Sequence, residues 1–373
     1  MKSFGGFEEM EKFIRKGYVP LILSAILLTG CGQKADVDTV NVVEAAEEER
    51  SQSESRSTIL EEKLEKEAEE RETSETQTQE KGVTFMDDIG RTVTVESHDR
   101  VITMIGSFTD IWMLAGGEVV GAANDSWTSF DLDLGEDVVN IGSHVEPDIE
   151  KIIAAKPDFV IASANTDADM DMEKILADAG ITTAYFSVSN FNEYMNMLEI
   201  CTDITGRKDL LEKNGYAVKA QIDKAREQVS IRNMQGKPAP EVVFLRASAS
   251  SVKAKGSYGS VGGEMLADLG CINIADDDDS LLDDLSMEAI IAADPDFIFV
   301  TTQGSDAQAV YANVEETLLG NPAWNQLTAV KEGRYIMLEK ELYNLKPNAR
   351  WGEAYQKLAD ILYGEEQKQT DAD

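Results

Sequence analysis

The residues best suited to binding a charged ligand are a few cations in a strongly acidic chain. The 373 residues include 34 Lys and Arg against 70 Asp and Glu, a net charge of −36. This balance argues against a nucleic acid partner, because phosphates bind to concentrated positive charge. Arg246, Lys253 and Lys255 nevertheless cluster, and Arg246 directly follows the apolar run VVFL. We expect Arg246 near a strand end, where the cluster either neutralises an anionic ligand or is ordinary solvated surface charge.

Two glutamates stand at the same place in an internal repeat. The segment EKIIAAKPDFV begins at Glu150 and EAIIAADPDFI begins at Glu288, with eight of eleven positions identical. Each copy predicts a helix, a proline stop and a buried strand, with the glutamate in the first helical turn. A carboxylate there gains about 0.3–1 kcal/mol from the helix dipole and needs no other role. Its recurrence in two halves of the chain favours a paired docking function.

Residues for catalysis or metal binding are sparse. The chain has two histidines, His98 and His144, which argues against a multi-histidine metal site. Its three cysteines cannot form a disulfide framework, and Cys201 and Cys271 are expected to be buried and inert. The run Asp276 to Asp279 lacks the spacing of an EF-hand and is expected to be a solvated loop. There is no G-x-S-x-G nucleophile elbow.

The N-terminal segment predicts a signal peptide followed by a spacer. Residues 1–30 contain basic residues followed by a short apolar run, which is typical of a signal peptide. Leu28-Thr29-Gly30-Cys31 resembles a bacterial lipobox, which implies that Cys31 is lipidated and becomes the mature N-terminus; an ordinary cleavable signal is the alternative. Residues 31–82 are rich in Glu and lack Trp, Tyr and Phe, so we expect a disordered, lipid-anchored tether.

The remaining chain predicts an α/β fold with two lobes. Apolar strand patterns alternate with helix patterns over residues 83–200 and again over 237–364, which indicates central, mostly parallel sheets covered on both faces. Residues 201–236 carry apolar side chains at helical spacing without a strand pattern, and predict one long bridging helix. Residues 365–373 are expected to form a tail.

Together these segments resemble the substrate-binding lipoproteins of ABC importers for iron–siderophore complexes, haem and cobalamin. The resemblance covers about residues 83–364 and rests on several motifs. They are DDIGRTVTV, IGSHVEPDIEKIIAAKPDFVI, GGEMLADLG, LSMEAIIAADPDFIFV, NPAWNQLTAVKEGRYIML and KPNARWGEAYQKLADILY. The resemblance implies two α/β lobes joined by a bridging helix, with the ligand held in the cleft between them. It also implies that Glu150 and Glu288 dock on arginine pockets of the permease.

Within that resemblance, five further residues are candidate ligand contacts. Ser107 and Phe108 lie at a strand-to-helix turn and either offer amides and a hydroxyl to a ligand or simply cap the helix. Trp127 either stacks on a ligand or covers an edge of the lobe. Tyr258, in the loop GSYGS, either stacks on or ligates a ligand or packs within the loop. Arg350 follows a loop whose family counterparts approach the cleft, and a core or capping role is the alternative.

The resemblance implies a protein on the outer face of the bacterial cytoplasmic membrane that captures a ligand and passes it to an ABC permease dimer. An iron(III)-siderophore-type chelate is our first expectation, because Arg246, Lys253 and Lys255 suit an anionic chelate. Haem or cobalamin is the alternative within the same family, and a surface receptor or adhesin is an alternative on the same scaffold. We expect no enzymatic activity, cofactor or resident metal.

Overall fold

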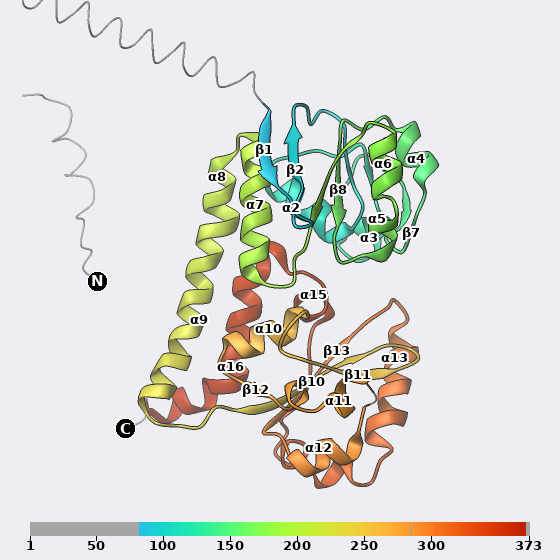
Figure 1. The fold of residues 1–373 in the computed structure, drawn as a ribbon. Coiled ribbons are helices and arrows are strands. Elements are labelled where there is room, and N and C mark those ends of the chain that lie inside the picture. The colour runs from blue at the N-terminus through green and yellow to red at the C-terminus, as the bar shows by residue number, and fades with distance from the viewer. Residues whose placement is uncertain (1–81, 284, 371–373) are drawn as a thin grey trace, which may run out of the picture. The chain divides into compact units, whose positions relative to one another are not determined.

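The computed structural model describes residues 82–283 and 285–370, and it shows two α/β lobes joined by helices (Figure 1). Residues 1–81 lie outside the described part, and they include the predicted signal peptide, Cys31 and the tether except Gly82. Residues 371–373 also lie outside it. Among the described residues, no helix is both long enough and apolar enough to span a membrane.

The N-terminal lobe is built on a parallel sheet with strand order β5-β4-β3-β8-β9. An antiparallel hairpin of β1 and β2 precedes this sheet, and Gly90 adopts a positive φ of 82° in its turn. Strands of this lobe are β1 Val83–Met86, β2 Thr92–Val95, β3 Val101–Thr103, β4 Gly121–Ala122, β5 Val139–Asn140, β6 Gly142–Ser143, β7 Glu146–Pro147, β8 Phe159–Ser163 and β9 Thr182–Phe186. Its helices are α2 Gly106–Leu114, α3 Asp125–Thr128, α4 Ile149–Ala154, α5 Asp167–Asp171 and α6 Glu173–Asp178.

Strand β8 shows why the sheet of this lobe is central. All five of its residues are buried. Phe159 and Ile161 face one apolar cluster, whereas Val160 and Ala162 face another. A strand with both faces buried is typical of a parallel sheet covered by helices.

The C-terminal lobe repeats this plan with the strand order β11-β10-β13-β14, and β12 also pairs with β10. Strand β11 is antiparallel to β10, and the other pairings are parallel. The strands are β10 Glu241–Ala247, β11 Val252–Lys255, β12 Ile272–Asn273, β13 Phe297–Thr302 and β14 Tyr335–Met337. The helical segments are α10 Val261–Asp268, η3 Ile274–Asp276, α11 Asp279–Asp283, α12 Met287–Ala293, α13 Ala307–Val314, η4 Glu315–Leu319, η5 Trp324–Gln326, α14 Thr328–Lys331, α15 Lys340–Tyr343, η6 Asn348–Arg350 and α16 Trp351–Thr370.

The expected long bridging helix is present, but it begins later than residue 201. Helix α7 spans Phe191–Thr205 and ends at Gly206, which takes the left-handed conformation at φ 70°. A second helical run then begins at Lys208 and continues through α8 Lys208–Leu211, η2 Glu212–Tyr216 and α9 Ala217–Met234. The bridging helix therefore begins about seven residues later than expected. Helix α16, which packs along α9, continues to Thr370, past the expected start of the tail.

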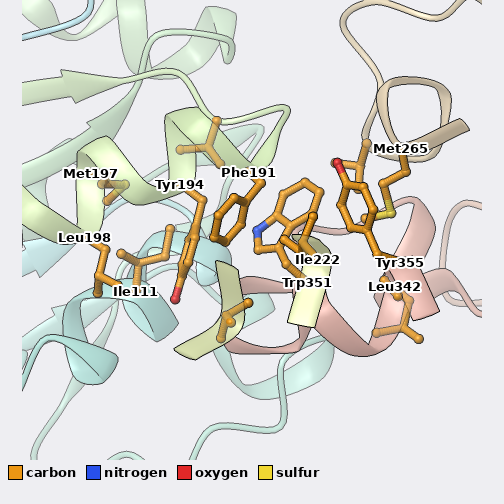
Figure 2. Packing of buried hydrophobic residues seen from close by; sticks show 14 of the residues in the cluster. Ile111, Phe191, Tyr194, Met197, Leu198, Ile222, Met265, Leu342, Trp351 and Tyr355 are labelled. Carbon is orange, nitrogen blue, oxygen red and sulfur yellow. The ribbon is translucent and has the colours of Figure 1, made fainter. Parts of the chain in front are cut away.

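One apolar cluster extends through both lobes and the helices between them. It includes Trp112 of the N-terminal lobe, Met265 of the C-terminal lobe and Ile222 of α9. Figure 2 shows Trp351 of α16 between Phe191 and Tyr355, with Ile222 beside it. The indole of Trp351 lies 6.3 Å from the ring of Phe191 and 6.4 Å from that of Tyr355, measured between centroids. The lobes therefore share buried apolar surface instead of meeting only at their rims.

Candidate functional site

Two adjacent cavities lie between the lobes. The wider one, of about 360 Å³, is lined by Ser107, Asp125 and His144 from the N-terminal lobe and by residues around Gly304 and Lys346 from the C-terminal lobe. The narrower one, of about 160 Å³, also draws its lining from both lobes. Asn344 and Lys346 line both cavities. We call the wider cavity the polar compartment and the narrower one the cationic compartment.

Three cations line the cationic compartment: Arg246, Lys255 and Lys346. None of the described residues that line it is acidic. Burial lowers the pKa of the Arg246 guanidinium. Burial also lowers the pKa of Lys255, and the positive charges of Arg246 and Lys253 add to that effect. The compartment therefore holds positive charge without a protein counter-charge on its wall.

Strand β10 places Arg246 in this compartment through its two-residue alternation. Val242 and Phe244 face the apolar cluster shared by the lobes, whereas Val243 and Leu245 face the cluster inside the C-terminal lobe. Arg246 continues the first of these two faces at the carboxyl end of the strand, where the apolar cover ends. This position agrees with the expectation from the sequence that Arg246 emerges near a strand end.

The polar compartment contains two buried oxygens without partners. Ser107 Oγ and Asp125 Oδ1 make no hydrogen bond within the described structure. The other carboxylate oxygen of Asp125 accepts a hydrogen bond of 3.0 Å from the amide of Gly106, at the first residue of α2. His144 Nδ1 lies 3.8 Å from the same oxygen. This compartment offers hydrogen-bonding groups of mixed character, in contrast to the positive charge of its neighbour.

Two of the predicted ligand contacts are corrected by their surroundings. Phe108 has no exposed surface, because helical periodicity turns its ring into the core while Ser107 lines the polar compartment. Ser107 is also not the cap of α2, since Ile105 occupies that position. Arg350 is exposed and forms an ion pair of 2.7 Å with Glu353, so its guanidinium is already satisfied outside both compartments.

The remaining two aromatic candidates also lie apart from these compartments. Trp127 is half-buried in α3 and lines neither of them. Tyr258 is 85% exposed and borders a third pocket of about 300 Å³, which is lined by Asn190 and Asn192 at the start of α7 and by Glu264 and Asp268 of the C-terminal lobe. Ser107 and Arg246 thus line the two compartments, whereas Phe108, Trp127, Tyr258 and Arg350 do not.

The loop before Arg350 was expected to approach the cleft, but no residue of the segment 344–348 was predicted as a ligand contact, although Asn344 and Lys346 line both compartments. Lys346 Nζ lies 5.5 Å from the centre of the Phe108 ring in the opposite lobe. The side-chain amide of Asn348 donates to Ser107 O at 2.9 Å and to Asp110 Oδ2 at 2.8 Å. Asn348 is fully buried between the lobes. The only local signal is the turn-forming sequence Lys-Pro-Asn.

The two repeat glutamates lie on the surface, one in each lobe. Glu150 is in the first turn of α4, where the cap Asp148 accepts hydrogen bonds from the amides of Glu150 and Lys151. Glu288 is in the first turn of α12, which is capped by Ser286. Both carboxylates are therefore presented to solvent at the beginning of equivalent helices.

The side chains considered for metal binding or redox chemistry are either buried or hold a loop in place. Cys201 and Cys271 are free and buried. Asp276 accepts a hydrogen bond of 2.7 Å from the amide of Ser257 and so fixes a loop of the C-terminal lobe. Within the ranges described, no three His, Cys, Asp or Glu side chains gather in a way that would hold a metal ion.

A model of the periplasmic binding protein family matches residues 101–342, most of the two-lobed fold. The chain belongs to the periplasmic binding protein family. The YvrC protein of Bacillus subtilis, described as an uncharacterised ABC transporter substrate-binding lipoprotein, is 24% identical over 93% of this chain and 96% of its own. The Fe(3+)-citrate-binding protein YfmC of B. subtilis is 23% identical over 69% of this chain and 78% of its own.

Among solved structures, IsdE of S. aureus complexed with heme shares the fold, with a TM-score of 0.58 and 18% identity over 71% of this chain and 98% of that one. The family consists of solute-binding proteins. The present protein is accordingly a substrate-binding component of an ABC importer and not an enzyme.

Proposed function

We propose that this periplasmic binding protein captures an iron(III)-siderophore-type chelate between its lobes and delivers it to an ABC permease. The observation that carries the proposal is the cationic compartment, where Arg246, Lys255 and Lys346 meet without an acidic residue on the wall. In a chain with a net charge of −36, such a compartment is suited to an anionic ligand. The name of the relative YfmC, an Fe(3+)-citrate-binding protein, is consistent with a ligand of this class.

Delivery would use the two exposed glutamates. Glu150 and Glu288 occupy equivalent helix starts in separate lobes, which suits a permease dimer with one basic pocket for each lobe. Ion pairs formed from these positions leave the cleft unobstructed, because neither residue lines a compartment between the lobes. Docking and ligand binding can therefore occur together.

The protein would be held at the outer face of the cytoplasmic membrane through a lipid on Cys31, with residues 31–82 as a spacer. The basis for this part is the lipobox-like sequence LTGC and the acidic composition that follows it. YvrC is described as a lipoprotein, which is consistent with this arrangement.

Haem or cobalamin is the second candidate ligand. His144 on the wall of the polar compartment and the fold shared with the haem complex of IsdE favour haem in particular. A visible spectrum of protein purified from iron-limited cells separates the candidates. We expect the broad charge-transfer band of a ferric chelate, whereas a Soret band or a corrin spectrum would overturn that expectation.

A further inference from the structure

Lys346 occupies an unusual position for a lysine. Its side chain lies over the Phe108 ring, and it borders both compartments of the cleft. Within the described residues, Nζ makes no hydrogen bond or ion pair, although surroundings that remove water lower the pKa of Lys346. Asp125 and Glu193 act from a distance and only partly offset this effect of burial. An ammonium group held in this way is costly unless an anion arrives beside it.

The neighbouring strands add charges of the same sign. In the antiparallel pairing of β10 with β11, Arg246 lies directly opposite Lys253, and Lys255 lies two residues further along the same face. Like charges in opposite positions of a sheet destabilise it. Neither Arg246 nor Lys255 forms an ion pair within the described part of the chain. Three cations from two separate segments therefore converge on one small cavity without internal neutralisation.

We propose that Arg246, Lys255 and Lys346 form a carboxylate-binding subsite, with Lys346 as the specificity-determining residue, and that the ligand is a ferric polycarboxylate chelate. This inference rests on the proposed function and specifies its ligand class. Carboxylates concentrate negative charge on paired oxygens, which suits a guanidinium flanked by ammonium groups. The side-chain amide of Asn344, also on this wall, supplies further hydrogen-bonding capacity, whereas the hydroxyls of Ser189 and Ser260 already donate to Glu193 and to the backbone oxygen of Gly256.

Lys346 has a role that Arg246 and Lys255 do not share, because it stands where the lobes touch. Two residues along, Asn348 holds α2 through Ser107 and Asp110. A ligand carboxylate that binds Lys346 therefore contacts the segment of the C-terminal lobe that is hydrogen-bonded to the N-terminal lobe through Asn348. A hydroxamate or macrocycle without such a group would leave the Lys346 ammonium without a counter-charge.

The test is calorimetric titration of the wild-type protein with ferric citrate, citrate alone, ferrioxamine B and haemin. Lys346→Met keeps the side-chain length and the packing over Phe108 but removes the charge. We expect it to weaken ferric citrate binding at least tenfold, while the thermal midpoint of the ligand-free protein stays equal or rises. Lys346→Arg should recover most of the affinity. The matched control is Lys224→Met, which removes an exposed charge on α9 outside both compartments and should change the affinity less than threefold.

The possible failures are distinguishable. If ferrioxamine B binds more tightly than ferric citrate and Lys346→Met leaves both affinities unchanged, the carboxylate subsite is wrong but capture of an iron chelate stands. If citrate alone binds as tightly as ferric citrate, the chelate is not the ligand. If haemin binds and neither iron chelate does, the proposed function itself fails.

Discussion

The side-chain amide of Asn348 in the C-terminal lobe donates to the backbone oxygen of Ser107 at 2.9 Å in the N-terminal lobe. The same amide donates to the carboxylate of Asp110 at 2.8 Å. Asn348 is fully buried and has a positive φ of 49°, which Asn tolerates better than most residues. One side chain thus joins the lobes through helix α2, directly beside the ligand compartments.

Removing this amide should destabilise the folded protein. Asn348→Gly keeps the left-handed backbone accessible and deletes both hydrogen bonds, so we expect the free energy of unfolding to fall by about 2 kcal/mol. Asn348→Ala should lose about 1 kcal/mol more, because a Cβ disfavours the left-handed conformation. Urea unfolding of both variants separates the contribution of the hydrogen bonds from that of the left-handed backbone. A glycine variant as stable as the wild type would show that the hydrogen bonds contribute nothing net.

Replacing the repeat glutamates should impair uptake and spare ligand binding. Glu150→Ala and Glu288→Ala each remove an exposed carboxylate at a helix start, at a cost of at most about 1 kcal/mol in stability. Uptake in cells should fall for each, fall further for the double variant, and fall most when Arg is introduced, because like charges then meet at the permease. The control is Glu199→Ala, an exposed acid on α7. If titration shows lost ligand affinity while permease association persists, the docking assignment is wrong.

Cys31→Ala should abolish lipidation. The variant should appear as a released protein or as an unprocessed precursor of higher mass, because the thiol is the acceptor in the lipobox-like sequence LTGC. Fractionation of cells followed by mass measurement distinguishes these forms. A variant that remains in the membrane fraction at the normal mature mass would contradict the assignment.

The burial of Asp169 should make the free energy of unfolding fall as pH rises from about 4 to about 7. The side chain is fully buried, Oδ2 accepts a hydrogen bond of 2.7 Å from the amide of Ser163, and Oδ1 has no partner in the described structure. Burial raises its pKa from 3.8 to about 7, so between these values the folded protein holds a proton that the unfolded chain has released. Stability is therefore highest on the acid side of this window and is lost as pH rises through it.

Asp169→Asn removes the charge and keeps an oxygen for the Ser163 amide. Between pH 5 and pH 8, the unfolding free energy of the wild type should decline by about 3 kcal/mol more than that of the variant, the equivalent of roughly two pKa units. Urea unfolding of both proteins at the two pH values checks this. Parallel pH profiles would show that Asp169 is ionised throughout.

The lobes were predictable because their strands carry strong local signals. Runs such as DFVIASA and DFIFVTT are apolar throughout and are followed or preceded by helix patterns, and they became β8 and β13. The position of Arg246 followed from the same run of buried residues. The start of the bridging helix was misplaced because apolar helical spacing continues across Gly206, whose left-handed conformation the pattern does not reveal.

The cleft was less predictable because its residues meet across large separations in sequence. Asn348 and Ser107 are 241 residues apart, and nothing local at either position indicates the other. The loop before Arg350 was expected to approach the cleft, but nothing in the turn Lys-Pro-Asn indicates that Lys346 stands at the junction of two cavities. Ser107 and Phe108 were considered together, but adjacent helical residues point in different directions, and only one of them faces the cleft.

The apolar cluster shared by the two lobes has a consequence for folding. Aromatic side chains of α7 and α16, among them Phe191, Trp351 and Tyr355, pack together in the apolar cluster that both lobes share (Figure 2). Unfolding of one lobe would expose this apolar surface of the other lobe to water, which lowers the stability of the lobe that stays folded. We therefore expect the two lobes to unfold in one cooperative transition, although each also holds a smaller apolar cluster of its own.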